Sequence, residues 1–466
     1  MELSQQFIEN RTFDEIKVGD SASLQRTLGA KDIQLFAVMS GDVNPAHMDP
    51  EYAASSMFHE VIAHGMWGGA LISTVLGTIY PGPGTVYIDQ TLHFSRPVTI
   101  GDTVTVTVTV KEKFERTRHV ILDCVCVNQE GRTVIRGTAE VLAPAEKVKR
   151  RRARLPEVRL HDPGARYRHL VELTKGRGAI SMGVVHPCDR QSLGGALSAA
   201  EAGLIKPVLI GPAAKILAAA EELGVDISAY ERVETEHSQE AAARGVQLVR
   251  EGKLEALMKG SLHTDELMAE VVTASGLRTA RRVSHVFYME LPAYPKPLLI
   301  TDAAVNIEPD LDAKVDIVQN AIDLALALNI QEPKVAILAA VETVSSKMRA
   351  TIDASALCKM AERGQIKGGL LDGPLAFDNA VSFIAAKTKG IVSAVAGQAD
   401  ILVVPDLESG NMVAKQLEYL ADAGSAGIVL GARVPIVLTS RADPVEARVA
   451  SCAIALLVAR NRRAAR

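Results

Sequence analysis

The chain has 466 residues, which exceeds what one hydrophobic core usually serves, so we expect two or three domains. Its hydrophobic fraction of 48%, charged fraction of 23% and formal net charge of -4 are ordinary for a globular protein. They exclude the electrostatic footprint of a protein that binds nucleic acid or an anionic membrane.

The amino terminus, residues 1–20, is polar and acidic without an apolar core, so no signal peptide is expected. No stretch reaches the roughly 18 to 20 apolar residues that span a bilayer. The apolar tail at 453–459 is instead predicted to be a buried terminal helix. Five scattered cysteines without a CxxC pair favour reduced thiols over disulfides or a zinc site, so the expected location is the cytoplasm.

A loop with a chemical character is predicted early in the chain, because Gly41, Asn44 and Pro45 are turn and breaker residues. The loop holds Asp42 and His47. A carboxylate and an imidazole that share a water are suited to general acid–base catalysis near neutral pH. For an isolated pair at this spacing, the competing interpretation is that the aspartate caps a helix and the histidine lies on the surface.

The segments after this loop predict a helix and three strands. Residues 61–78 are apolar on nearly every side and rich in glycine, as expected of a helix that other elements enclose. Residues 103–110 alternate strictly between threonine and valine, and 120–127 and 132–141 are rich in β-forming residues, so antiparallel strands are predicted.

The string Gly-Asp-x-Asn-Pro-x-His at residues 41–47 closely resembles the signature of the (R)-specific enoyl-CoA hydratases, the MaoC-like branch of the hot-dog fold. The resemblance covers roughly residues 10–143, and Ala46 is a small departure from it. It continues through four further stretches, at 58–66, 72–73, 81–84 and 94–102. It implies an α+β fold in which an antiparallel sheet wraps a long central helix.

The same resemblance implies that Asp42 and His47 hold and deprotonate a water that adds to a trans-2-enoyl-CoA. Helix-start amides near residues 64–67 would stabilise the thioester oxyanion, aided by the helix dipole. Four residues are expected to contact the substrate, namely Asn44, Gly65, Met66 and Ser73. His64 is assigned a structural role, because a helix-start histidine in an apolar run is more often a hydrogen-bonded core group.

Charge clusters between prolines at residues 144–156, so we expect a linker at 144–164 between a first domain at 1–143 and a second at 165–466. The basic run could contact nucleic acid, but no aromatic residues are interleaved with it. A solvated connector is therefore the preferred interpretation.

The second domain is predicted to be α/β with mainly parallel sheets. Apolar strands at 207–211, 334–338, 400–405 and 435–439 alternate with helices such as 317–328. Because ligands bind beyond the carboxyl ends of such strands, the candidate residues are those that follow strands: Asp302, Glu342, Asp406, Ser440 and Arg441. Neither GxGxxG nor GxxxxGK[ST] follows a strand, so common nucleotide binding is not expected.

Five stretches of this domain together resemble the phosphate acetyl/butyryltransferase family, over roughly residues 165–466; they lie at 258–264, 284–289, 300–306, 372–380 and 437–443. The resemblance implies two α/β lobes with the site between them. It also implies exchange of an acyl group between CoA and inorganic phosphate. Asp378 within one stretch is interpreted as a helix cap.

That reaction needs donors for phosphate, stabilisation of an oxyanion and help for the departing thiolate. Arg441 suits bidentate phosphate contact, and Ser440 is placed to hydrogen-bond the sulfur or the oxyanion. Lys259, Gly260 and Ser261 form a plausible anion cradle, and Asp302 is counted among the substrate contacts. The family's acetyl branch has paired aspartates where this chain has Glu446 and Ala447, so Glu446, Asp443 and Asp302 remain alternative bases.

One chain with both halves resembles the bifunctional enoyl-CoA hydratase/phosphate acetyltransferase proteins. Coenzyme A thioesters and phosphate are expected as substrates, with no tightly bound cofactor and no metal. A homo-oligomer is expected, with neither nucleic acid nor membrane as a partner. The alternative is that one half only binds: the second as an acyl-CoA-sensing module, or the first as an oligomerisation module.

Overall fold

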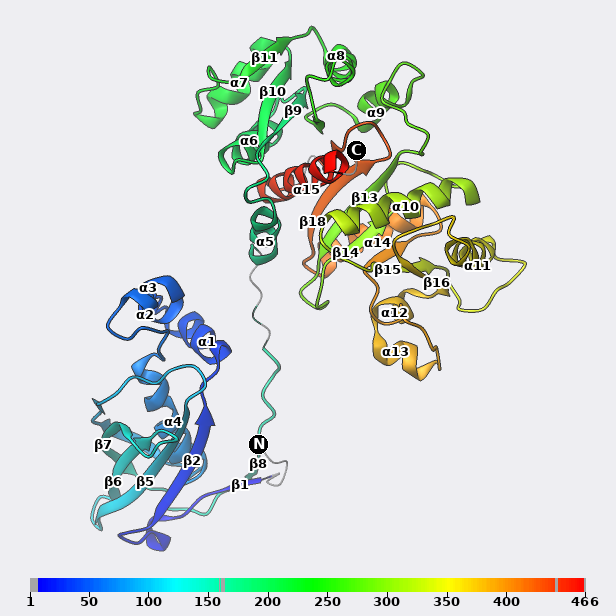
Figure 1. Ribbon diagram of the computed structural model, residues 1–466. Helices are drawn as coiled ribbons and strands as arrows, with labels where there is room; N and C mark the ends of the chain where they lie inside the picture. Colours follow the sequence, from blue (N-terminus) through cyan, green and yellow to red (C-terminus); the bar gives the residue numbers. More distant parts are fainter. Residues whose placement is uncertain (1–6, 159, 161–163, 441–442, 465–466) are drawn as a thin grey trace. The chain divides into compact units, whose positions relative to one another are not determined.

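The chain divides into two compact units, Met1–His161 and Asp162–Arg466 (Figure 1). The computed structural model describes residues 7–158, 160, 164–440 and 443–464. The hydrophobic clusters of the first unit and those of the second share no residue, so each unit has a core of its own.

The first unit is an antiparallel sheet with one long helix against it. The strands follow the order β2 (Ser21–Thr27), β5 (Thr103–Phe114), β6 (His119–Val127), β7 (Thr133–Leu142) and β3 (Val86–Gln90), with β4 (His93–Phe94) also on β7. The helices are η1 (Phe13–Glu15), α1 (Ala30–Ser40), α2 (Pro45–Met48), α3 (Pro50–Ser55) and α4 (Gly65–Thr78). The predicted α+β hot-dog class is confirmed, and so are the three predicted strands.

Helix α4 is enclosed on one face only. Trp67, Gly68 and Ile72 face the core, whereas Met66 and Ser73 are exposed. The expectation of an enclosed helix is therefore wrong for the outer face of this single chain. Close approach to the sheet has a clear cause: a Cβ on Gly68 would lie 2.2 Å from a side-chain atom of Ile135 on β7.

Part of the segment predicted as a linker belongs to the first unit. Strand β8 (Lys149–Arg151) pairs antiparallel with β1 (Phe7–Glu9), and Lys147 forms ion pairs with Glu9 and Glu15. Glu9 and Glu15 lie far from Lys147 in the sequence, so the composition of the basic run alone does not reveal these ion pairs. Residues 152–158 lack helix and strand and are exposed, as expected of a connector.

The second unit is built on one sheet of eleven strands, and its α/β class is confirmed. Its strand order is β11 (Glu231–Glu234), β10 (Ile205–Gly211), β9 (Ile180–Val185), β12 (Ala256–Lys259), β19 (Ile436–Val437), β18 (Gly424–Leu430), β13 (Ser284–Glu290), β14 (Leu298–Thr301), β17 (Ile401–Val403), β15 (Lys334–Leu338) and β16 (Leu370–Leu375).

Eleven helices accompany this sheet in the described part of the unit: α5 (Ala165–Leu173), α6 (Arg190–Glu201), α7 (Ala213–Leu223), α8 (Ser238–Arg250), α9 (Thr264–Val272), α10 (Leu311–Ala327), α11 (Arg349–Glu362), α12 (Phe377–Val381), α13 (Phe383–Thr388), α14 (Leu407–Leu420) and α15 (Val445–Ala464). Helix α15 contains the predicted terminal helix and is longer at both ends. Its central residues from 450 to 459 are buried, as the apolar pattern predicts.

Strand direction in this sheet changes in the middle. The pairs β19–β18, β18–β13 and β13–β14 are antiparallel, while all the pairs outside this centre are parallel. Three reversals separate β19 from β14. The carboxyl ends of β9, β12 and β19 therefore lie at one edge of the sheet, and those of β14, β15 and β17 lie at the opposite edge.

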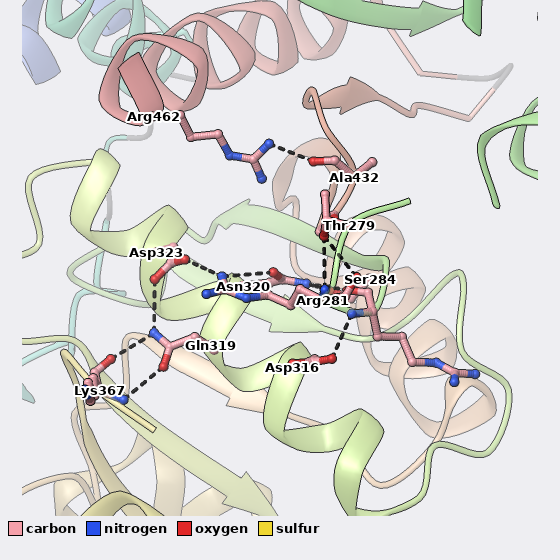
Figure 2. Close-up of polar contacts among 12 residues, drawn as sticks. Thr279, Arg281, Ser284, Asp316, Gln319, Asn320, Asp323, Lys367, Ala432 and Arg462 are labelled. Atoms are coloured by element: carbon pink, nitrogen blue, oxygen red, sulfur yellow. Dashed lines mark hydrogen bonds and ion pairs between the residues drawn. The ribbon is translucent and has the colours of Figure 1, made fainter. Parts of the chain in front are cut away.

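A polar network that is buried at Asn320 and Ser284 and partly exposed at Arg281 and Asp323 joins α10 to the loop before β13 (Figure 2). The Asn320 side chain donates to the Arg282 carbonyl oxygen and to Ser284 Oγ, both at 2.9 Å, while Arg281 pairs with Asp323. Arg462 of α15 donates to the Ala432 carbonyl oxygen. A cavity of about 240 Å³ lies among α10, β18 and α15, but these polar groups bond within the protein. The network therefore has a structural role: it holds α10 against the loop before β13.

We expect replacement of Asn320 by leucine to destabilise the second unit by about 2–3 kcal/mol, because it leaves buried polar partners unsatisfied. Asn320 is 1% exposed and Ser284 fully buried. Urea unfolding measures the effect as a lower midpoint. Exposed Asp312→Asn on the same helix is the control and should change the free energy of unfolding by less than about 1 kcal/mol. Equal midpoints for both variants would contradict a structural role for the network.

Candidate functional site

The first candidate site is built on the loop between α1 and α2. Helix α1 ends at Gly41, whose φ of 76° suits glycine, and Asn44 caps α2 by accepting the amide of Ala46. These two stops turn the chain twice within a few residues. Asn44, predicted as a substrate contact, is thus placed as a helix cap that positions its neighbours Asp42 and His47.

Asp42, His47 and His64 come together beside the start of α4, since one carboxylate or ring atom from each lies within 4.8 Å of the others. His47 Nδ1 lies 2.9 Å from the Ile62 carbonyl oxygen. Because a carbonyl only accepts, Nδ1 carries the proton, and Nε2 of the neutral ring is the acceptor. The loop thus presents a carboxylate next to an imidazole base.

His64 is 2% exposed and holds the loop in place. Its Nε2 lies 3.0 Å from the backbone oxygen of Asp42, and its ring lies against that of His47 with centroids 4.0 Å apart. The hydrogen bond across the loop is consistent with the structural role expected from the sequence.

A cavity of about 380 Å³ opens beside the two histidine rings. Its walls are mostly apolar and include Trp67, Phe94 and Ile135. Gly65 lines it, but among the described residues neither Met66 nor Ser73 does. An apolar cavity next to a base suits an acyl chain with a polar reacting end.

Fewer amides at the start of α4 are available to a substrate oxygen than the sequence indicates. The Trp67 amide donates to the His64 carbonyl oxygen at 2.9 Å, so it serves the first turn of the helix. The amides of Gly65 and Met66 are the remaining candidates for an oxyanion contact.

The second candidate site lies at the edge of the large sheet where β9, β12 and β19 end. The amides of Gly260 and Ser261 donate to the carbonyl oxygens of Val185 and His186, and the Lys259 ammonium donates to those of Gly260 and Leu262. Both amides of the predicted anion cradle are therefore used inside the protein. Packing explains this, because a Cβ on Gly260 would lie 2.4 Å from both of those carbonyl oxygens.

His186 is a residue of this edge that the sequence interpretation missed. Ser261 Oγ donates to the His186 carbonyl oxygen, so it accepts from His186 Nδ1, each at 2.9 Å. Burial and the nearby Lys215 ammonium hold the pKa of the His186 ring below its ordinary value. The sequence does contain a signal for His186, because this residue directly follows the apolar strand β9, as the other candidates follow theirs.

Ser440 follows β19 at the same edge, and Arg441 lies outside the described residues. The Asp443 carboxylate accepts the Ser440 amide at 2.7 Å, and the Ser440 carbonyl oxygen accepts from Arg448 at 2.9 Å. Burial raises the pKa of the Asp443 carboxyl above its ordinary value, although the Ser440 hydrogen bond opposes it. Glu446 is exposed, whereas Asp443 is buried next to Ser440.

Three of the residues that follow strands lie at the opposite edge, where they have structural partners. Asp302 accepts the amides of Ala304, Val305 and Asn306 and the Asn306 side chain. Asp406 caps α14, and Glu342 pairs with Lys389, which lowers the pKa of that carboxyl.

The expected helix cap at Asp378 is wrong. Asp378 lies within the first turn of α12, where it pairs with Lys389 at 3.4 Å, and Ser382 caps the next helix by accepting the amide of Ala385. Two short helices replace the single helix that the pattern at 380–386 suggested.

Among the residues that the structure describes, no helix combines the length and apolar character needed to cross a bilayer.

Comparison with known proteins separates the same two halves. A MaoC like domain model matches residues 14–125, and a phosphate acetyl/butaryl transferase model matches residues 238–456. A phosphate acetyltransferase of Rhizobium meliloti is 61% identical over 302 residues, which is 65% of this chain and 96% of that protein. A phosphate butyryltransferase of Clostridium acetobutylicum is 42% identical over 261 residues, 56% of this chain and 87% of that protein.

Two solved structures resemble the chain. A branched-chain phosphotransacylase from Enterococcus faecalis V583 is 29% identical and covers 60% of this chain and 99% of its own, with a TM-score of 0.53. An (R)-hydratase from Pseudomonas aeruginosa is 43% identical and covers 33% of this chain and 99% of its own, with a TM-score of 0.33.

A hot-dog half joined to an α/β half of the phosphotransacylase type defines a fused two-domain enzyme. The chain belongs to the phosphate acetyl/butaryl transferase family and carries a MaoC-like domain ahead of that part. Both family resemblances inferred from the sequence are thereby confirmed.

Proposed function

We propose that the chain acts on acyl-CoA at two sites: (R)-specific hydration of trans-2-enoyl-CoA in the first unit, and acyl transfer between CoA and phosphate in the second. The observation that carries the first is the His47 ring, which lies in one cluster with Asp42 and whose Nδ1 is held by the Ile62 carbonyl oxygen, so that Nε2 is left as the acceptor. The second rests on identity of 61% to a phosphate acetyltransferase over 96% of its length.

In the hydratase step, Asp42 and His47 hold a water against C3 of the enoyl group. His47 Nε2 takes one proton as the oxygen attacks C3, and the electron pair moves to the thioester oxygen, where the amides of Gly65 and Met66 stabilise the charge. His47 then returns that proton to C2 as the electron pair moves back from the thioester oxygen, which gives the 3-hydroxyacyl-CoA and restores the neutral ring. The apolar cavity beside the dyad would take the acyl chain.

In the transferase step, a phosphate oxygen attacks the thioester carbonyl and the C–S bond breaks as CoA thiolate leaves. Arg441 would bind phosphate, and Ser440 would hydrogen-bond the sulfur or the oxyanion. We assign Asp443 as the group that exchanges the proton with the CoA sulfur. It is buried beside Ser440, whereas Asp302 is fully engaged at the other edge and Glu446 is exposed.

A second candidate role for the first unit, pairing with another copy of the chain, is favoured by the exposed face of α4 and agrees with the homo-oligomer expected from the sequence. This role accompanies catalysis in the proposal. The proposed function requires no tightly bound cofactor and involves neither nucleic acid nor a membrane. We propose that the protein acts in the cytoplasm.

The test uses one preparation of the full chain. We expect loss of the enoyl absorbance of crotonyl-CoA without added phosphate, and phosphate-dependent CoA release from acetyl-CoA and butyryl-CoA. If either activity is missing from chain that performs the other, the corresponding half is a binding or assembly module and the bifunctional proposal fails.

A further inference from the structure

The hydratase mechanism leaves one buried group unused, the second nitrogen of His64. His64 Nε2 bonds to the Asp42 carbonyl oxygen, and since a carbonyl only accepts, Nε2 carries the proton. The lone pair of the neutral ring is then on Nδ1. This Nδ1 is buried and has no hydrogen-bond partner in the described chain. An unsatisfied buried acceptor is costly, which suggests a ligand.

His47 is arranged in the same way. Its Nδ1 donates to the Ile62 carbonyl oxygen and its Nε2 keeps the lone pair. Histidines that bind metal ions typically donate one ring N–H to a carboxylate or a backbone carbonyl, which fixes the tautomer and aims the other nitrogen at the metal. Two adjacent rings, 4.0 Å apart, thus have the outer hydrogen bonds of metal ligands.

Asp42 supplies the third ligand. One ligand atom from each of Asp42, His47 and His64 lies within 4.8 Å of the others. In a tetrahedral zinc site with bonds of about 2.0–2.2 Å, neighbouring ligand atoms lie roughly 3.3–3.5 Å apart. Asp42 Oδ1 accepts the Asn44 amide at 3.2 Å, so the second carboxylate oxygen of this exposed side chain is the one that would bind the ion. A fourth position would remain open towards the cavity that the two histidines line.

We propose that Asp42, His47 and His64 form a binding site for Zn²⁺ and that zinc bound there reversibly blocks hydration. The block follows because coordination takes the His47 lone pair and the Asp42 carboxylate, the groups that otherwise receive and orient the water. The inhibitory part rests on the proposed hydratase function. The binding part stands on geometry alone.

The binding test uses full-length chain stripped with a chelator and titrated with Co²⁺, whose tetrahedral complexes absorb strongly in the visible range. We expect one equivalent of Co²⁺ to produce that spectrum and Zn²⁺ to displace it. His64→Ala and Asp42→Asn should each weaken binding at least tenfold. Asp42 is an exposed loop residue, so its variant keeps the test valid if the buried His64 variant does not fold. His93→Gln, on an exposed strand position, is the control and should bind as the parent does.

Crotonyl-CoA hydration is then measured with Zn²⁺ and after addition of EDTA. Inhibition that EDTA reverses supports the proposal, while activation by Zn²⁺, or activity indifferent to a saturating ion, overturns the inhibitory role. Absence of a cobalt spectrum that depends on Asp42 and His64 overturns the site itself. A chain that binds Co²⁺ through these residues but hydrates nothing would instead contradict the hydratase function and leave the site standing.

Discussion

Replacing Asp42 by asparagine is expected to lower kcat for crotonyl-CoA hydration by about 100- to 10,000-fold while phosphate-dependent CoA release stays unchanged. Asparagine has the shape of aspartate and can still accept the Asn44 amide, so the loop should keep its conformation. What is lost is the charge that orients water beside His47. Steady-state kinetics of both reactions on one preparation give the measurement.

The matched control for this variant is Glu51→Gln, which removes an exposed carboxylate a short distance along the same segment. It should leave both activities within about twofold. Comparable loss of hydration in both variants would mean that net charge near the cavity matters and that Asp42 has no special role. Loss of both activities in Asp42→Asn would show that the two sites are not independent.

Replacing Asp443 by asparagine is expected to lower kcat for phosphate-dependent CoA release by about 100- to 10,000-fold without lowering stability. Burial raises the pKa of this carboxyl in the folded protein. A raised acid pKa means that the folded state holds its proton more tightly, so stability falls as pH rises from the ordinary value through the raised one. Asparagine removes that penalty and can still accept the Ser440 amide. Thermal unfolding at neutral pH should therefore give a Tm at or above that of the parent.

Glu446→Gln separates Asp443 from its nearest competitor. Glu446 is exposed and lies at the start of α15, so its replacement should leave transfer within about threefold of the parent. The reverse outcome, with transfer lost in Glu446→Gln and kept in Asp443→Asn, would move the proton-exchanging role to Glu446.

Much of the structure of the first unit could be predicted because it follows from patterns among residues that are close in the sequence. Alternation at 103–110 and the stops at Gly41 and Asn44 depend on neighbours in sequence, and the structure has a strand and a loop there. The exposed outer face of α4 could not be predicted, since small residues suit a helix that packs closely on one side as well as one enclosed on all sides. Gly68 shows that close packing here is towards β7.

The second unit was harder because strand direction is a long-range property. Apolar strands followed by Asp302 and by Ser440 look alike in sequence, yet three antiparallel pairings set their carboxyl ends at opposite edges of the sheet. The same reasoning overlooked His186, which follows a strand at the edge of Ser440. Only the pairing partners of β13 and β18 reveal which strand ends belong together.

If the first unit is the proposed hydratase, the hydrogen bond from His47 to the Ile62 carbonyl oxygen separates its chemistry from its substrate selectivity. Its acceptor is a main-chain oxygen, which every amino acid possesses, so an exchange of the side chain at position 62 does not remove it. Substitution of the residues that line the cavity should therefore leave the tautomer of His47 unchanged. Substitutions at Trp67 and Phe94, which line the cavity, could thus change the length of acyl chain that it accepts. The orientation of His47 Nε2 would stay the same.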